Sequence, residues 1–301
     1  MYSHDHGDQQ IIAVFSDIHS NYHALQACYE DAVKLGAGSF LFLGDYVSDL
    51  AAPRQTMDLV YEIQSRHPTV CLRGNRERYM LDRAKGTTAF SRGSKTGSLL
   101  YTYEQLRRQD LDFFESLKIA DTIQVGGIAI GIAHASKEDD RCYFEEGTPQ
   151  IQSIFAGMDG QYLLTGHSHK QYMASRGGKI IVNPGSVGIP QGGSRWPSYA
   201  LMCLDGDSVS FRLRQVPYDL TPVIHAQFES GLVEYGKCWA ISMLYDVMTC
   251  EEKTIELLKL VQQRGDVSDE DLWRATAAQM GMKFTEREIL EFASEVGRSK
   301  E

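Results

Sequence analysis

Six short apolar runs, each followed at once by small or polar residues, constrain the fold of this chain most strongly. The runs are IIAVF (11–15), SFLFL (39–43), TVCL (69–72), IAIGIA (128–133), YLLT (162–165) and KIIV (179–182). Runs of this length and composition are typical of buried β-strands, and the residues after them are typical of turns. Helical patterns separate the early runs, so the sequence predicts a largely parallel inner sheet of an α/β fold.

The helical patterns have recognisable ends. Asn21 is expected to cap a helix that stops at Gly36, and a second helix is expected from Met57 to Ser65. The segment 199–214 predicts a β-hairpin that turns at Asp205 and Gly206. This hairpin suggests a second, antiparallel-containing sheet packed on the first.

The character of the chain changes after about residue 235, where helical spacing dominates. Thr285 and Glu288 have the spacing of a capping box. Three glycines, at 265, 281 and 297, fit helix ends. We therefore predict a main domain over residues 1–235 and a helical C-terminal appendage over 236–301.

Side chains that can bind a metal follow five of the predicted strands. They are Asp17 and His19, Asp45, Asn75, His134, and His167 with His169. The carboxyl ends of parallel strands converge on one edge of a sheet, where ligands usually bind. Seven candidate ligands exceed the needs of one tetrahedral ion and suit a two-metal site, in which Asp45 is the natural bridging carboxylate. Each residue alone is more simply a turn or core residue, but five coincident strand ends favour the metal site.

The charge of the chain restricts its partners. It has 40 acidic and 30 Lys or Arg residues and a formal net charge of −10, so duplex DNA would be repelled by the average surface and a nuclease is disfavoured. Two divalent ions would leave about one local positive charge after Asp17, Asp45 and a hydroxide are counted. A phosphate-bearing ligand is therefore compatible with an acidic protein.

Several motifs together resemble those of the calcineurin-like metallophosphoesterases. In order, they are Asp17-Ile-His19-Ser-Asn21, Gly44-Asp45-Tyr46-Val47, Gly74-Asn75-Arg76-Glu77, His134, Gly166-His167-Ser168-His169 and Asn183-Pro184-Gly185-Ser186. The likeness extends from about residue 10 to 220 and is strongest to a compact bacterial branch of phosphodiesterases and diadenosine-polyphosphatase-like enzymes. It implies a four-layer α/β/β/α sandwich. It also implies one ion held by Asp17, His19, Asp45 and His169, and another held by Asp45, Asn75, His134 and His167.

The resemblance further implies manganese, iron, zinc or nickel as cofactors. A hydroxide bridging two metals would hydrolyse phosphoester or phosphoanhydride bonds of a nucleotide-like compound or a small phosphodiester or anhydride. A phosphoprotein phosphatase of the Ser/Thr type remains an alternative, and so does a non-catalytic metal-binding scaffold. The chain departs from many relatives at Arg76, where they carry a histidine. Arginine grips phosphoryl oxygens but cannot donate a proton at pH 7, so we expect leaving groups that need little protonation.

Location and assembly follow from weaker features. No apolar run approaches the ~20 residues of a membrane helix, and MYSHDHGDQQ lacks the regions of a signal peptide. The six cysteines form no CxxC pair. We expect a cytoplasmic protein with a small phosphorylated substrate and no membrane partner, which could form a homo-oligomer through its C-terminal helices.

Overall fold

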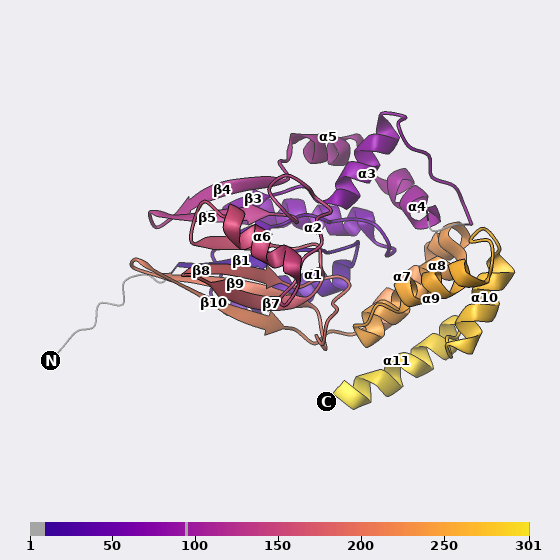
Figure 1. The fold of residues 1–301 in the computed structure, drawn as a ribbon. Coiled ribbons are helices and arrows are strands. Elements are labelled where there is room, and N and C mark those ends of the chain that lie inside the picture. Colours follow the sequence, from indigo (N-terminus) through magenta and orange to yellow (C-terminus); the bar gives the residue numbers. More distant parts are fainter. Residues whose placement is uncertain (1–9, 94–95, 301) are drawn as a thin grey trace.

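Two stacked five-stranded sheets form the centre of the computed structural model, which describes residues 10–93 and 96–300 (Figure 1). The N-terminal residues used for the compartment prediction lie mostly outside this range. In the first sheet, the order is β10 (Ser208–Gln215), β9 (Ser198–Asp205), β1 (Gln10–Phe15), β2 (Ser39–Phe42) and β3 (Thr69–Cys71). In the second, it is β4 (Ala120–Val125), β5 (Ile128–Ala133), β6 (Tyr162–Thr165), β8 (Lys179–Pro184) and β7 (Gln171–Arg176).

Each sheet combines parallel and antiparallel pairs of strands. Strands β1, β2 and β3 run parallel, and so do β5, β6 and β8. All six predicted runs are strands. The predicted hairpin exists as β9 and β10, but its assignment to the second sheet was wrong, because β9 pairs with β1. β9 is buried along almost its whole length, which suits an interior position. Antiparallel β4 and β7 complete the second sheet instead.

Alternation along the strands builds the layers. Ile12 and Val14 of β1 pack between the two sheets, whereas Ala13 and Phe15 face the opposite side. Helices α1 (Tyr22–Lys34), α2 (Pro53–Arg66), α3 (Asn75–Ala84) and α5 (Arg108–Ser116) contribute to the core on that outer side. Helix α6 (Pro149–Gly157) packs on the outer face of the second sheet through Ile151 and Phe155. The predicted α/β/β/α sandwich is confirmed.

Helix ends follow the predicted caps in part. The side chain of Asn21 accepts the N–H of Ala24 at the start of α1, as expected. Helix α2 begins earlier than predicted, at Pro53, whose fixed φ suits the first turn. The capping box of Thr285 and Glu288 is present. Gly297 lies inside α11 (Glu286–Lys300), so its prediction as a helix end was wrong.

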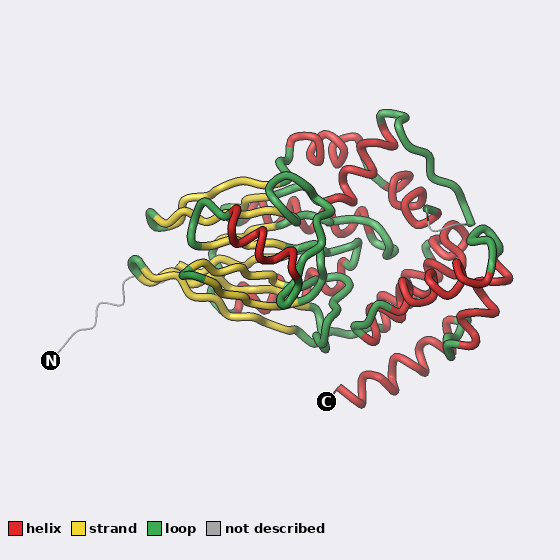
Figure 2. Tube along the Cα trace, in the orientation of Figure 1, coloured by secondary structure: helices red, strands yellow, loops and turns green. Residues whose placement is uncertain are grey.

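The C-terminal helices gather beside the sandwich, opposite the hairpin ends of the strands (Figure 2). They are α7 (Thr221–Glu229), α8 (Leu232–Thr249), α9 (Lys253–Arg264), α10 (Glu270–Gln279) and α11. Their shared core includes Leu50 and Ile189 from sandwich loops. Ile289 and Ala293 of α11 are buried in the same core.

The predicted domain division at residue 235 falls inside α8, next to its break at Lys237. The continuous helical region already starts with α7 at Thr221. Because one core joins these helices to the sandwich, the division stays a prediction. In the described part of the chain, no helix combines the length and the apolar character needed to cross a membrane.

Candidate metal centre

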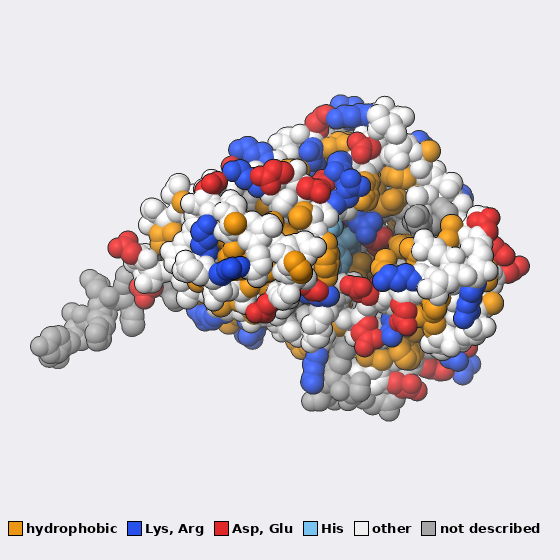
Figure 3. Space-filling view, in the orientation of Figure 1, with side chains coloured by type: hydrophobic (Ala, Val, Ile, Leu, Met, Phe, Trp, Pro, Cys, Tyr) orange, Lys and Arg blue, Asp and Glu red, His pale blue; other side chains and the backbone are white. Residues whose placement is uncertain are grey.

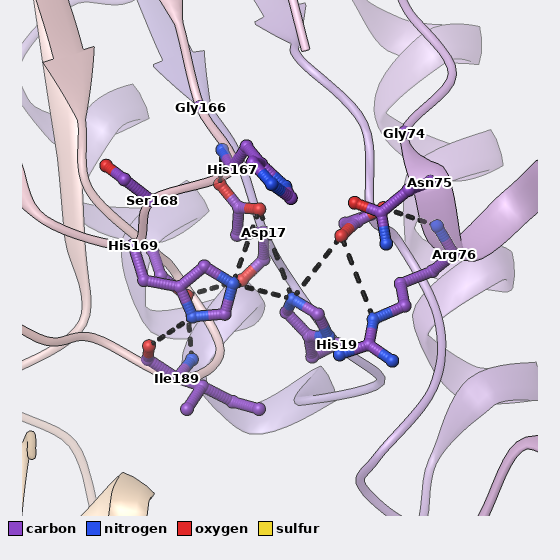
Figure 4. Close-up of polar contacts among 12 residues, drawn as sticks. Asp17, His19, Gly74, Asn75, Arg76, Gly166, His167, Ser168, His169 and Ile189 are labelled. Atoms are coloured by element: carbon purple, nitrogen blue, oxygen red, sulfur yellow. Dashed lines mark hydrogen bonds and ion pairs between the residues drawn. The ribbon is translucent and has the colours of Figure 1, made fainter. Parts of the chain in front are cut away.

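The predicted ligands meet where parallel strands of both sheets end (Figure 4). Asp17 and His19 follow β1, Asp45 follows β2, and Asn75 opens α3 just beyond β3. His134 follows β5 directly, and His167 and His169 follow β6. Most of these side chains are buried, and they form two adjoining clusters.

The first cluster joins Asp17, His19 and His169, whose ligand atoms lie within 4.8 Å of one another. The Nε2 atoms of the two histidines are 3.0 Å apart. Oδ1 of Asp17 lies 3.5 Å from Nε2 of His169 and 4.0 Å from Nε2 of His19. Among the described residues, this buried oxygen has no hydrogen-bond donor.

The second cluster joins Asp45, His134 and His167, again within 4.8 Å. Nε2 of His134 lies 3.6 Å from Oδ2 of Asp45 and 3.2 Å from Oδ1 of Asn75. The same Asp45 oxygen lies 3.7 Å from Nε2 of His19 in the first cluster. Asp45 Oδ2 therefore lies between the two clusters, in the position expected of a bridging carboxylate.

Hydrogen bonds on the outer side of the rings fix how the imidazoles point. Nδ1 of His134 donates to the carbonyl of Leu43 at 2.8 Å, and Nδ1 of His169 donates to the carbonyl of Ile189 at 2.9 Å. Nδ1 of His19 contacts the carboxylate of Asp49 at 3.1 Å. With the proton on Nδ1, each Nε2 presents a lone pair to the cluster, as metal-binding histidines do.

This donor set fits a cation. Nε2 of His19 and Nε2 of His169 face each other across 3.0 Å, a distance that requires a proton or a metal ion between the two nitrogens. Burial lowers the pKa of His169 to about 3 and that of His167 to about 4, so both rings are neutral at pH 7. Neutral imidazoles with carboxylate and amide oxygens suit manganese, iron, zinc or nickel better than magnesium alone.

The backbone at the centre is strained. Five candidate ligands have positive φ although none is glycine: Asp17 (55°), His19 (50°), Asp45 (55°), His167 (68°) and His169 (60°). Such conformations are uncommon for residues other than glycine, although Asp and His adopt them more readily than most, and they persist where the surroundings enforce them. The Asp45 carbonyl accepts the N–H groups of both Ile18 and His19, and thereby holds one loop against the other.

Glu77 is an organising residue to which the sequence analysis assigned no role. Its buried carboxylate accepts the N–H groups of Gly74 (2.9 Å), Asp45 (2.9 Å) and Tyr46 (2.8 Å). Burial and the neighbouring Asp45 raise the pKa of Glu77 to about 7, against the effect of these donors. Its place two residues after Asn75 was the signal, since this is the third position of α3. Glu77 ties the loop that carries Asp45 to the loop that carries Asn75.

Arg76 lies beside the centre, with a quarter of its side chain exposed. Its Nη2 lies 3.1 Å from Oδ2 of Asp49, and its backbone N–H donates to Oδ1 of Asp45 at 2.8 Å. Burial alone would lower the pKa of Arg76, but Asp49 and Asp45 outweigh it and raise the pKa. The guanidinium therefore stays charged.

Comparison with known proteins places this centre in a family. A family model described as the calcineurin-like phosphoesterase superfamily domain matches residues 11–207, which include all seven candidate ligands. The chain belongs to this superfamily. Membership confirms the resemblance drawn from the motifs. It also leads us to expect metal ions in the two clusters.

Individual proteins also resemble much of the chain. An uncharacterised protein of Methanocaldococcus jannaschii is 26% identical over 246 residues, which cover 75% of this chain and 96% of the relative. A hypothetical protein from Pyrococcus horikoshii OT3 has a TM-score of 0.65 at 17% identity, covering 75% of this chain and 98% of its own. A metallophosphoesterase from Sphaerobacter thermophilus has a TM-score of 0.63 at 22% identity, covering 80% and 98%. At these identities the two structures support the shared fold alone.

A cavity of about 330 Å³ lies next to the centre. In Figure 3, histidine surface lies in a recess between the sandwich and the C-terminal helices, with basic and hydrophobic side chains around it. The cavity residues are Asp49, Arg76, Tyr79, Thr96, Leu99, His169, Ile189, Gln191, Trp239, Met243, Asp246, Ile255 and Leu258. The last five belong to α8 and α9, which the sequence did not connect with the site.

Proposed function

We propose that this chain hydrolyses phosphoester or phosphoanhydride bonds with two bound metal ions. The observation that carries the proposal is the position of Asp45 Oδ2 between two clusters of donors, 3.7 Å from His19 Nε2 and 3.6 Å from His134 Nε2. Asp17, His19 and His169 would hold one ion with Asp45. Asn75, His134 and His167 would hold the other with the same carboxylate. Manganese, iron, zinc or nickel suits these nitrogen-rich donors.

The residues around the ions have separable tasks. Ions bound there would activate water at neutral pH and offset the charge of the phosphoryl group. Asp49 holds His19 through Nδ1 and holds the Arg76 guanidinium at 3.1 Å. Arg76 can then bind phosphoryl oxygens with its planar fork. It cannot protonate the leaving oxygen, so the reaction is expected to depend on the leaving group's own stability as an anion.

A series of aryl phosphates with graded leaving-group pKa tests this reaction. For the protein loaded with manganese, we expect kcat/KM to fall steadily as the leaving-group pKa rises from about 7 to 10. The variant Arg76→Lys should lose about tenfold in kcat/KM across the series, because the fork is lost and the charge retained. Arg66→Lys, on the exposed side of α2, is the control. A rate that does not change with leaving-group pKa would contradict the absence of a proton donor.

The two alternatives predict other outcomes of the same measurements. A phosphoprotein phosphatase would hydrolyse phosphoserine or phosphothreonine peptides faster than every small ester. A scaffold would bind metal stoichiometrically and turn over none of these compounds. We favour the small-molecule phosphoesterase because the cavity beside the centre, about 330 Å³, is the size of a small ligand site.

A further inference from the structure

We propose that the C-terminal helices bind an apolar organic group of the substrate, directly beside the phosphate that the metal centre receives. This inference rests on the proposed hydrolase function and adds the class of substrate. The expected compound is a phosphate monoester or diester with one compact, uncharged aromatic substituent. A chain of several phosphates is not expected.

The helical wall is made by side chains that share one face of each helix. Trp239, Met243 and Asp246 of α8 are spaced at i, i+4 and i+7. Ile255 and Leu258 of α9 are spaced at i and i+3. Four of these five side chains are apolar, so this side of the cavity offers mainly hydrophobic surface.

The same cavity is continuous with the metal centre. Its lining includes His169, a candidate ligand, and Arg76, the guanidinium beside Asp45. A phosphoryl group bound between these two side chains would have its substituent inside the cavity. Leu99 and Ile189 line the cavity as well, so an apolar substituent would lose water contact on several sides.

Local structure holds the helical wall in place. Helix α8 is interrupted at Lys237, whose φ of 50° and ψ of −131° are non-helical. The backbone N–H of the next residue, Cys238, donates to Oε1 of Glu270 in α10 at 2.9 Å. This N–H therefore has a hydrogen-bond partner where the helix begins again. The ring of Trp239 then packs edge-on against Trp273, with centroids 6.1 Å apart. The wall is preformed and needs no ordering when a ligand enters.

The charges of the cavity decide between substrate classes. Of the described residues that line it, Arg76 is the only Lys or Arg, and Asp49 already engages this guanidinium. Asp246 places a carboxyl group on the helical wall. A second phosphate extending from the centre would meet this carboxyl and apolar surface without a cation. An uncharged apolar substituent meets neither obstacle.

Non-hydrolysable phosphonates separate binding from turnover. Calorimetry on manganese-loaded protein should show that (1-naphthylmethyl)phosphonate binds at least about tenfold more tightly than methylphosphonate, because its ring buries apolar area. Methylenediphosphonate, a non-hydrolysable analogue of pyrophosphate, should gain no such advantage over methylphosphonate. Equal dissociation constants for the two monophosphonates, or tighter binding of methylenediphosphonate than of the naphthyl compound, would overturn the inference.

Two variants locate the effect on the helical wall. Met243→Ala should reduce the naphthyl-to-methyl preference about threefold, and Trp239→Phe tests the indole while keeping a ring. Met248→Ala is the matched control, since this methionine of the same helix is fully buried in the core and does not line the cavity. If Met248→Ala changed the preference as much as Met243→Ala, the wall would not be the binding surface.

Turnover of phenyl phosphate is measured in parallel. Its complete absence, with the phosphonate preference intact, would refute the hydrolase function and keep the apolar site. Turnover without the preference for the naphthyl compound would support the hydrolase function and refute the apolar site.

Discussion

The cavity has two unlike walls. The sandwich wall is made by loop residues such as Asp49 and His169, both in backbone conformations of positive φ, and the buried candidate ligands lie next to it. The helical wall consists of regular helix faces with apolar side chains such as Trp239 and Met243. This difference is what the two proposals require, with reaction chemistry beside one wall and recognition of the substituent at the other.

The carboxyl groups on the two walls also differ in the direction in which their surroundings shift the pKa. Burial alone would raise the pKa of Asp49 on the sandwich side, but Arg76 and His19 outweigh it and lower the pKa. Burial raises the pKa of Asp246 on the helical side well above its usual value, and the nearby Asp49 and Glu252 act in the same direction. The negative charge of Asp49 is therefore stabilised on the sandwich side, whereas that of Asp246 is disfavoured on the helices.

The largest effect is expected from Asp45→Asn in the metal centre beside the sandwich wall. An amide keeps the shape but removes the charge and one donor oxygen between the clusters. Metal content, measured by atomic emission, should fall by at least one ion per chain. Turnover of an aryl phosphate should fall by more than roughly 100-fold, the upper end of the loss that is typical when a hydrogen-bond partner of a metal ligand is changed.

A buried carboxylate elsewhere controls for lost stability. Asp110 is fully buried and accepts hydrogen bonds from Tyr61 and Arg107. Neither partner is a candidate metal ligand. Asp110→Asn should lower the unfolding midpoint and leave the metal content of the folded protein unchanged. If both variants retained two ions, Asp45 would not be a bridging ligand and the contrast between the walls would weaken.

A smaller effect is expected from Asp49→Asn, which changes a partner of the ligands. The carboxylate contacts His19 Nδ1 and Arg76 Nη2, each at 3.1 Å. We expect a loss of 10- to 100-fold in metal affinity, measured by competition with a chelating dye, because His19 loses its fixed orientation. Asp207→Asn in the exposed β9–β10 turn is the control. If metal affinity were unchanged and activity were reduced, Asp49 would act only through its contact with Arg76.

The metal centre beside the sandwich wall was predictable from sequence because its residues stand next to strand ends. Asp17, Asp45 and His134 each follow an apolar run, and parallel strands bring such positions together. The sheet membership of the hairpin was not predictable, because the sequence of a hairpin does not specify which other strand it pairs with. Glu77 carried a motif signal, but its hydrogen bonds to Gly74 and Tyr46 depend on loops that meet only in the folded chain.

The helical wall could not be found in this way. Trp239 and Met243 have the spacing of ordinary core residues, and nothing local distinguishes a side chain that packs in a core from one that lines a cavity. Their position depends on the break at Lys237, which the sequence does not mark with glycine or proline at that residue. Contacts between distant segments, here through Leu50 and Ile189, set where the helices lie.

The smallest effect is expected from Asp246→Asn on the helical wall. Because burial raises the folded-state pKa of Asp246 above its unfolded value near 4, the folded protein holds this proton more tightly. Its contribution to stability is complete below about pH 4 and is lost as pH rises through the folded-state pKa. Asparagine keeps the acceptor for the N–H of Thr254, now 2.8 Å from Oδ1, and has no such loss.

At pH 8 the variant should be more stable than the wild type by about 1 kcal/mol, an ordinary size for one buried substitution. Urea unfolding from pH 5 to 8 measures this, and the advantage should grow with pH. An advantage that is constant over this range would mean that Asp246 titrates like an exposed carboxyl, and the two walls would then not differ in how they treat charge.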